Sequence, residues 1–181
     1  MFLLGHLGIT ATVVFAINKR YFPSLSLDYR VIFVLAMLPD LIDKTMGHII
    51  LRDELNSGRL VAHTLLFSML GTLVLYRFSN KNWQLLSLPL WLHISLDRIW
   101  ENVHVMLWPL QGWGFPSRDY NVLAHWWEIF TTDPYTIAGE LVGGLLILML
   151  MWKLELYKWK NMKRFLETGR IEKEREPAKA P

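Results

Sequence analysis

Acidic and histidine side chains recur at the ends of the most apolar stretches of this chain. The motif "MLPDLID" places Asp40 and Asp43 three residues apart, and "HISLD" places His93 and Asp97 four residues apart. In a helix either spacing puts both side chains on one face, so each pair could bind the same object. Imidazole and carboxylate groups without thiolates suit Zn, Mn or Fe. The two pairs therefore predict ligands for a divalent metal ion.

Three more ionisable side chains fall in or beside apolar runs, namely His6, His63 and Glu140. Ionisable groups inside a bilayer usually mark a functional site, because an unpaired aspartate near its centre costs roughly 2.5 to 3.5 kcal/mol on insertion scales. A bound divalent cation offsets that cost. The expected metal ligands are His6, Asp40, Asp43, His63, His93 and Asp97.

The number of ions can be argued from charge and coordination. The three aspartates carry a charge of minus three, so one divalent ion leaves the site negative, whereas two leave it at plus one and attract an anion. Six ligands also exceed the three that usually hold a catalytic zinc ion, and two nearby ions suit phosphoester displacement. We therefore predict two divalent ions, with Zn preferred and Mn or Fe as alternatives.

Each of these residues also has a simpler interpretation. Asp40 and Asp43 could end a helix among lipid headgroups, with Lys44 paired to Asp43. The His93 and Asp97 side chains could form a hydrogen-bonded pair four residues apart. Glu140, in "AGELVGG", could line a helix contact among small residues.

Composition indicates what must position these side chains. The chain has 181 residues, 52% of them hydrophobic, with nine Trp and no Cys, which is too apolar for an ordinary soluble domain. Continuous apolarity predicts five transmembrane helices at about 2–17, 31–43, 61–76, 84–100 and 136–152. We expect an all-α, polytopic membrane bundle over 1–155, followed by a charged and partly disordered tail over 156–181. The absence of Cys excludes disulfides and thiolate metal sites.

The distribution of basic residues predicts the orientation. Ten Lys and Arg up to Arg164 follow the first, third and fifth spans, and five lie in the longer opposite loops. The positive-inside rule then places the N-terminus outside and the C-terminal tail in the cytoplasm of a plasma (inner) membrane protein. All seven ionisable side chains reach the outer face. The basic residues thus indicate membrane orientation rather than nucleic-acid binding.

The segment from Glu101 to Tyr135 is rich in Trp, which favours the bilayer interface. Within it, "NVLAHWWEIF" could form a short amphipathic helix on the outer surface. Such a helix could roof the metal site.

Several motifs resemble one known family, the LexA-regulated, YdjM-like, membrane-bound metal-dependent hydrolases. They are "GHLGIT", "LPDLID", "GRLVAHT", "HISLD" and "LWPL", which cover most of residues 1–145. The resemblance implies that the six residues named as ligands bind metal, and it makes Arg59 the arginine of the family's His-Arg-x-x-Thr-His-Ser block. The chain departs from that block at Gly58 and Thr64, which replace its first histidine and its serine.

Together these observations predict a membrane-embedded hydrolase that uses metal-activated water on a phosphoester or ester of a lipid-like or phosphorylated small-molecule substrate. Asp43 or Glu140 would orient the water, and Arg59 would bind the anion. Membrane lipids are the expected partners. Two alternatives remain: a metal- or proton-coupled transporter, which predicts ionisable groups through the whole membrane depth, and a non-catalytic, metal-stabilised scaffold.

Overall fold

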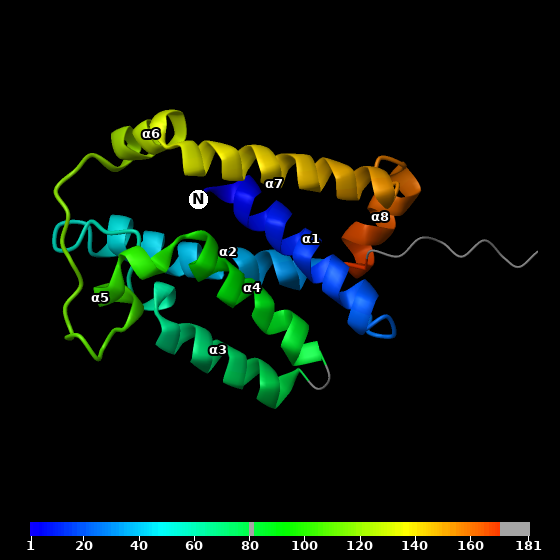
Figure 1. Cartoon of the computed structure of the whole chain (residues 1–181), viewed down its shortest axis with the longest axis horizontal. Coiled ribbons are helices and arrows are strands. Elements are labelled where there is room, and N and C mark those ends of the chain that lie inside the picture. Colours follow the sequence, from blue (N-terminus) through cyan, green and yellow to red (C-terminus); the bar gives the residue numbers. More distant parts are fainter. Residues whose placement is uncertain (80–81, 171–181) are drawn as a thin grey trace, which may run out of the picture.

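The computed structural model describes residues 1–79 and 82–170, and within these ranges it contains eight α-helices and no strand. Helices α1 (Leu3–Tyr21), α2 (Tyr29–Thr45), α4 (Trp83–Leu96) and α7 (Pro134–Lys153) run along the long axis, and α3 (Leu65–Phe78) packs beside α4 (Figure 1). Two short helices, α5 (Val103–Met106) and α6 (Val122–Thr132), lie at one end, and α8 (Trp159–Thr168) lies at the other. The all-α prediction is confirmed.

Polar side chains define where the helices begin. The Asp28 carboxylate accepts a hydrogen bond from the Arg30 amide at the start of α2, and the Thr64 hydroxyl accepts one from the amide of Phe67 at the start of α3. Asp133 caps α7, whose first residue is Pro134. Such caps satisfy amides that have no partner inside the helix, and proline suits this first position.

Helices α1 and α7 approach each other so closely that only glycine fits at the contact. A Cβ atom on Gly8 would lie 2.0 Å from the carbonyl oxygen of Gly143, and one on Gly143 would lie 2.2 Å from the carbonyl oxygen of Leu4. Small residues at helix contacts of this kind are typical of membrane bundles. This contact fixes the first turns of α1 against α7.

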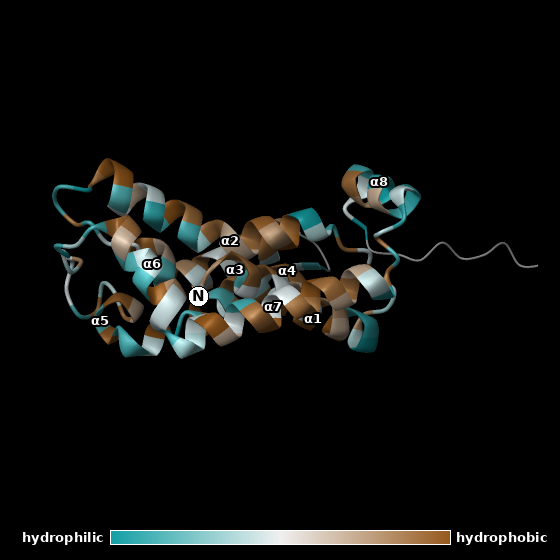
Figure 2. Cartoon of the chain, turned by 90° about the horizontal axis from the view of Figure 1, so that it is seen from above, coloured by the Kyte–Doolittle hydropathy of each residue, from teal (hydrophilic) through white to brown (hydrophobic). Residues whose placement is uncertain are grey.

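The apolar core lies toward the end that carries α8. It includes Val14 of α1, Ile32 of α2, Leu85 of α4 and Leu150 of α7. By contrast, the outward faces of α2, α3 and α7 expose large apolar side chains, among them Val34, Leu41, Leu70, Leu73, Leu145 and Leu148. Figure 2 shows these apolar stretches along the helices, with hydrophilic residues toward both ends.

Of the described helices, only α7 is both long and apolar enough to cross a bilayer by itself. Helix α3 is apolar but has 14 residues, as does α4, so each spans roughly 21 Å at 1.5 Å per residue. The five predicted spans therefore appear as helices, of which α3 and α4 are too short for a full bilayer crossing. Helices α1 and α2 have 19 and 17 residues, and α7 is distinguished from them by combining length with apolarity. The predicted tail begins with α8, and residues 171–181 lie outside the described residues, as does Lys81.

Candidate metal centre

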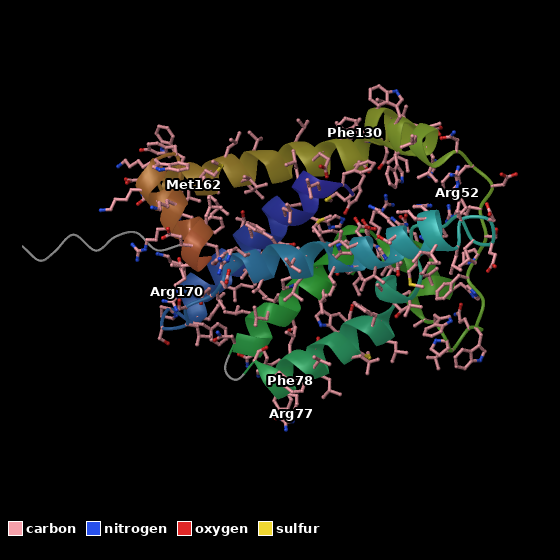
Figure 3. All side chains as sticks on the ribbon, turned by 180° about the vertical axis from the view of Figure 1, so that it is seen from behind. Arg52, Arg77, Phe78, Phe130, Met162 and Arg170 are labelled. Atoms are coloured by element: carbon pink, nitrogen blue, oxygen red, sulfur yellow. The ribbon has the colours of Figure 1, made fainter. Side chains whose placement is uncertain are left out.

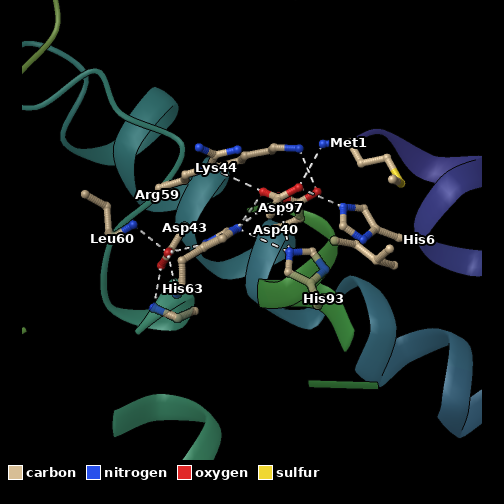
Figure 4. A network of polar contacts seen from close by, with 12 residues as sticks. Met1, His6, Asp40, Asp43, Lys44, Arg59, Leu60, His63, His93 and Asp97 are labelled. Atoms are coloured by element: carbon tan, nitrogen blue, oxygen red, sulfur yellow. Dashed lines mark hydrogen bonds and ion pairs between the residues drawn. The ribbon is translucent and has the colours of Figure 1, made fainter. Parts of the chain in front are cut away.

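Four side chains from three parts of the chain meet at the end of the bundle opposite α8. Asp40 comes from the last turns of α2, and His63 comes from the 3-10 turn η2 (Val61–His63). His93 comes from α4, and Asp97 follows its last residue. One ligand atom from each of the four lies within 4.8 Å of the others, and all four residues are buried. The four side chains, hereafter the four-residue group, could hold a metal ion (Figure 4).

Hydrogen-bond partners assign the tautomers of both histidines in this group. Nδ1 of His93 lies 2.7 Å from the carbonyl oxygen of Ala36. A carbonyl oxygen only accepts, so Nδ1 carries the hydrogen and Nε2 keeps a lone pair in the neutral ring. Nδ1 of His63 lies 2.8 Å from Oδ2 of Asp43, and an ionised carboxylate assigns the same tautomer there.

The two lone-pair nitrogens consequently face each other. Nε2 of His93 and Nε2 of His63 are 3.2 Å apart, and Nε2 of His63 is also 3.6 Å from Oδ1 of Asp40 and 3.4 Å from Oδ2 of Asp97. Lone pairs and carboxylate oxygens at these distances repel one another unless a cation lies among them. A divalent metal ion or a proton meets that requirement, and the chemistry of the donors suits Zn, Mn or Fe.

Asp43 is placed behind His63 rather than within the group. Its carboxylate accepts hydrogen bonds from the backbone amides of Leu60, Ala62 and His63 at 2.6, 2.9 and 3.1 Å, as well as from the His63 ring. Carboxylates in this position orient a metal-binding histidine and increase its basicity. The structure thus shows Asp43 holding His63, although its spacing from Asp40 suggested a direct ligand.

His6 approaches the group from α1. Its Nε2 lies 3.1 Å from Oδ1 of Asp97, and its ring stacks on that of His93 with centroids 4.1 Å apart. The fully buried Nδ1 atom of His6 has no hydrogen-bond partner within the described residues. His6 therefore contacts the four-residue group through Asp97 and His93 without belonging to it.

Glu140 lies apart from the group and binds the start of α1. Its carboxylate accepts hydrogen bonds from the amides of Phe2, Leu4 and Gly5 at 2.9, 2.9 and 3.0 Å. These amides begin the helix and have no partner within it. Glu140 therefore holds α1 to α7. The apolar residues around it in the sequence gave no indication of these three backbone partners.

Cationic side chains flank both aspartates of the group. Nζ of Lys44 lies 2.7 Å from Oδ2 of Asp40, and Nε of Arg59 lies 3.3 Å from Oδ2 of Asp97. The amino group of Met1 lies 2.8 Å from Oδ1 of Asp97. Lys44 was expected to pair with Asp43 if it paired at all, but the spacing of four residues on α2 favours Asp40.

A pocket of about 360 Å³ leads from Asp40 and Asp97 to the molecular surface. Its lining includes four cationic side chains, Lys44, Arg59, Arg98 and Arg118. Arg98 is paired with Glu101, whereas Arg118 has no ion pair within the described residues. The lining also includes four acidic side chains, those of Asp40, Asp97, Glu101 and Asp133. Arg118 is therefore the lining cation that is left to attract an anion.

Sequence reasoning did not single out two histidines of the pocket, His48 and His125. Both line the pocket. Burial lowers the pKa of His48, and the nearby ammonium of Lys44 lowers it further, so this imidazole is neutral near pH 7. Their place depends on how η1 (Met46–Ile50) and α6 meet, which no local pattern reveals.

Comparison with known families gives one result. The model of a family described as YdjM inner membrane protein matches residues 1–162, a range that includes every residue of the four-residue group and the pocket. Neither the curated proteins nor the solved structures contain a match to the chain.

Proposed function

The chain belongs to the YdjM inner membrane protein family, and we propose that it is a membrane-embedded, metal-dependent hydrolase that cleaves a phosphoester or ester of a lipid-like substrate. One observation carries this proposal: two members of the four-residue group, Asp40 and Asp97, line an open pocket that also contains four cationic side chains. Buried ionisable groups of this kind inside a membrane protein usually mark a site. The pocket provides the access that a purely structural metal site does not need.

We propose that Asp40, His63, His93 and Asp97 hold the ion, with Zn preferred. Charge no longer requires the second ion that the sequence suggested, because Lys44 and Arg59 balance the charges of Asp40 and Asp97. With Asp40, Asp43, Asp97, Lys44 and Arg59 counted, one divalent ion then makes the local charge plus one, which attracts an anion. A bound divalent cation supplies Lewis acidity, which polarises the bond to be cleaved and makes water more acidic.

The protein residues have separate roles in this proposal. Asp43 fixes the ring of His63 and the carbonyl of Ala36 fixes that of His93, so both Nε2 atoms keep their orientation. Arg59 binds the anionic oxygens of the substrate at the pocket wall. Asp40 and Asp97, which line the pocket, would hold the ion where a substrate in the pocket can reach it.

The proposed membrane arrangement keeps the five predicted spans, now α1, α2, α3, α4 and α7. Exposed apolar side chains on α2, α3 and α7 supply a lipid-facing surface. In Figure 3, Arg52 lies near the end that carries the pocket, and Arg77 and Arg170 lie near the other. We propose that the pocket end faces outward and the α8 end faces the cytoplasm, as the excess of basic residues there favours.

The test combines metal analysis with turnover. The purified full chain in lipid nanodiscs is stripped with a chelator, reloaded with Zn, Mn or Fe, and assayed on an anionic phospholipid and on a soluble phosphodiester. We expect activity only after reloading, with at least a hundredfold loss in His93→Ala and none in His104→Ala, whose ring is exposed and contacts the carbonyl of Gly114.

Three outcomes would contradict parts of the proposal. Metal binding without turnover of either substrate would favour the metal-stabilised scaffold. Equal turnover in stripped and reloaded protein would exclude a metal-dependent reaction. Metal movement across sealed vesicles without hydrolysis would favour the transporter.

A further inference from the structure

A second, apolar groove lies beside the cation-lined pocket. It has a volume of about 240 Å³ and is lined by five large apolar or aromatic residues: Phe2, Leu123, Trp126, Trp127 and Phe130. Four of them belong to α6, whose side chains Leu123, Trp127 and Phe130 are 74%, 69% and 50% exposed. Contiguous apolar surface of this kind on a membrane-interface helix indicates a binding surface.

The groove and the pocket share two walls. Phe2 and Trp126 line both of them, and Phe2 packs edge-to-face on Phe130 with ring centroids 5.8 Å apart. A molecule that contacts these shared walls could therefore extend from the pocket into the groove. The pocket side of the shared wall is charged, and the groove side is apolar.

Lys44 marks the boundary between the two chemistries. Its Nζ atom lies 6.0 Å from the ring centroid of Phe2 and 5.7 Å from that of Trp126, within reach of both rings. The same atom pairs with Asp40 of the four-residue group. The lining thus changes from charged to apolar at Lys44, a single side chain that contacts the four-residue group.

Caps at both ends hold α6 in this position. The Asn121 side chain accepts a hydrogen bond from the Ala124 amide at the start of α6. At its end, Asp133 accepts hydrogen bonds from the amide and the hydroxyl of Thr136 at 3.0 and 2.6 Å, which fixes the turn into α7. The groove is therefore a preformed part of the pocket end (Figure 1).

We propose that the groove on α6 binds a hydrocarbon chain of the substrate while its anionic headgroup occupies the cation-lined pocket. This inference rests on the proposed function and specifies its substrate as an anionic amphiphile with at least one alkyl chain. An alkyl chain is the favoured occupant because the groove adjoins the proposed anion site and is apolar throughout its lining. Each fully buried methylene strengthens binding about fourfold.

The experiment measures affinity and turnover as a function of chain length. A series of alkyl phosphates from two to ten carbons is titrated into the Zn-loaded full chain in nanodiscs, with binding followed by calorimetry and hydrolysis followed separately. Wild-type protein and variants share the same lipid, so partitioning of the probe into the bilayer cancels in their comparison. After correction for that partitioning, we expect the affinity of the wild-type protein to rise at least tenfold as the alkyl chain lengthens from two to ten carbons.

Two variants with exposed tryptophans form a matched pair. Trp127→Ala should reduce this rise to threefold or less and leave the affinity for ethyl phosphate unchanged, because Trp127 lines the groove and not the pocket. Trp152→Ala, at the opposite end of α7 and 76% exposed, should match wild type. Leu123→Ala provides the same test as Trp127→Ala if the latter does not fold.

The two proposals fail in different ways. Hydrolysis of ethyl and decyl phosphate with equal KM, in wild type and Trp127→Ala alike, would overturn the groove as a chain site and leave the hydrolase intact. Binding that depends on chain length and on Trp127, without hydrolysis, would support the groove and contradict the hydrolase. A chain-length effect that persists unchanged in both Trp127→Ala and Leu123→Ala would also overturn the groove.

Discussion

Helices α1, α2, α4 and α7 pack around apolar side chains at one end of the bundle and around ionisable side chains at the other. Near α8 they bury Val14, Ile32, Leu85 and Leu150, and near α6 they bury His6, Asp40, His93 and Glu140. An apolar side chain gains stability from any close neighbour, whereas a buried charge requires a partner of defined position and sign. The same framework thus has one end that tolerates repacking and one that does not.

The largest expected effect concerns the side of the membrane on which each end lies. A reporter fused after Glu101, at the ionisable end, should be active outside the cytoplasm, and one fused after Thr168, at the end of α8, should be active inside. These all-or-none signals follow from the basic residues gathered at the α8 end. A cytoplasmic signal at Glu101 would contradict both the topology and the outward-facing pocket.

The next largest expected effect is a difference in bound metal between a variant at the ionisable end and a variant at the apolar end. Asp97→Ala removes the partner of His6, His63 and Arg59, so it should release bound metal and lower the free energy of unfolding by about 3 to 5 kcal/mol. Leu85→Ala, in the apolar core, should lower it by about 2 to 5 kcal/mol and retain metal. Metal analysis and denaturation of both variants provide the measurement.

Either of two results would contradict this difference. Wild-type metal content in Asp97→Ala would show that the group does not hold the ion. Loss of metal in Leu85→Ala would show that the two ends are not independent.

The smallest effect tests how the contact between α1 and α7 supports the ionisable end. Gly143→Ala places a Cβ 2.2 Å from the carbonyl oxygen of Leu4, so the helices must separate, at a cost of about 1 to 3 kcal/mol. Gly144→Ala meets only Leu4 Cδ1, at 3.6 Å, and should be neutral or slightly stabilising. Equal melting temperatures for these neighbouring variants would contradict the close approach.

Much of the fold and part of the site could be predicted from the sequence. Local spacing suffices for His93 and Asp97, because residues four apart share a helix face, and the amphipathic pattern predicted the helix that the structure confirms as α6. The apolar runs located all five long helices. These predictions depend only on residues close together in the chain.

Other assignments depend on contacts that spacing does not encode. Asp43 shares a helix face with Asp40, yet its oxygens accept hydrogen bonds from three backbone amides of the loop and turn over Leu60–His63. Glu140 has the composition of a site residue and binds amides 135 to 138 residues away. Arg59 changes the charge count because it meets Asp97, which lies 38 residues away in the chain. Such partners become visible only once the helices are placed together.

The Glu140 contact also has a consequence for the order in which the protein matures. Synthesis delivers α1 first and α7 last among the five long helices, so the amides of Phe2, Leu4 and Gly5 wait for their acceptor while more than a hundred residues are added. His6 follows directly after these amides, so the turn that carries it contacts Glu140 only when α7 has been made. This contact is therefore completed late in biogenesis, whereas the whole four-residue group precedes α7 in the chain. A chain that ends before Pro134 should consequently bind metal, and bind it more weakly than the full chain.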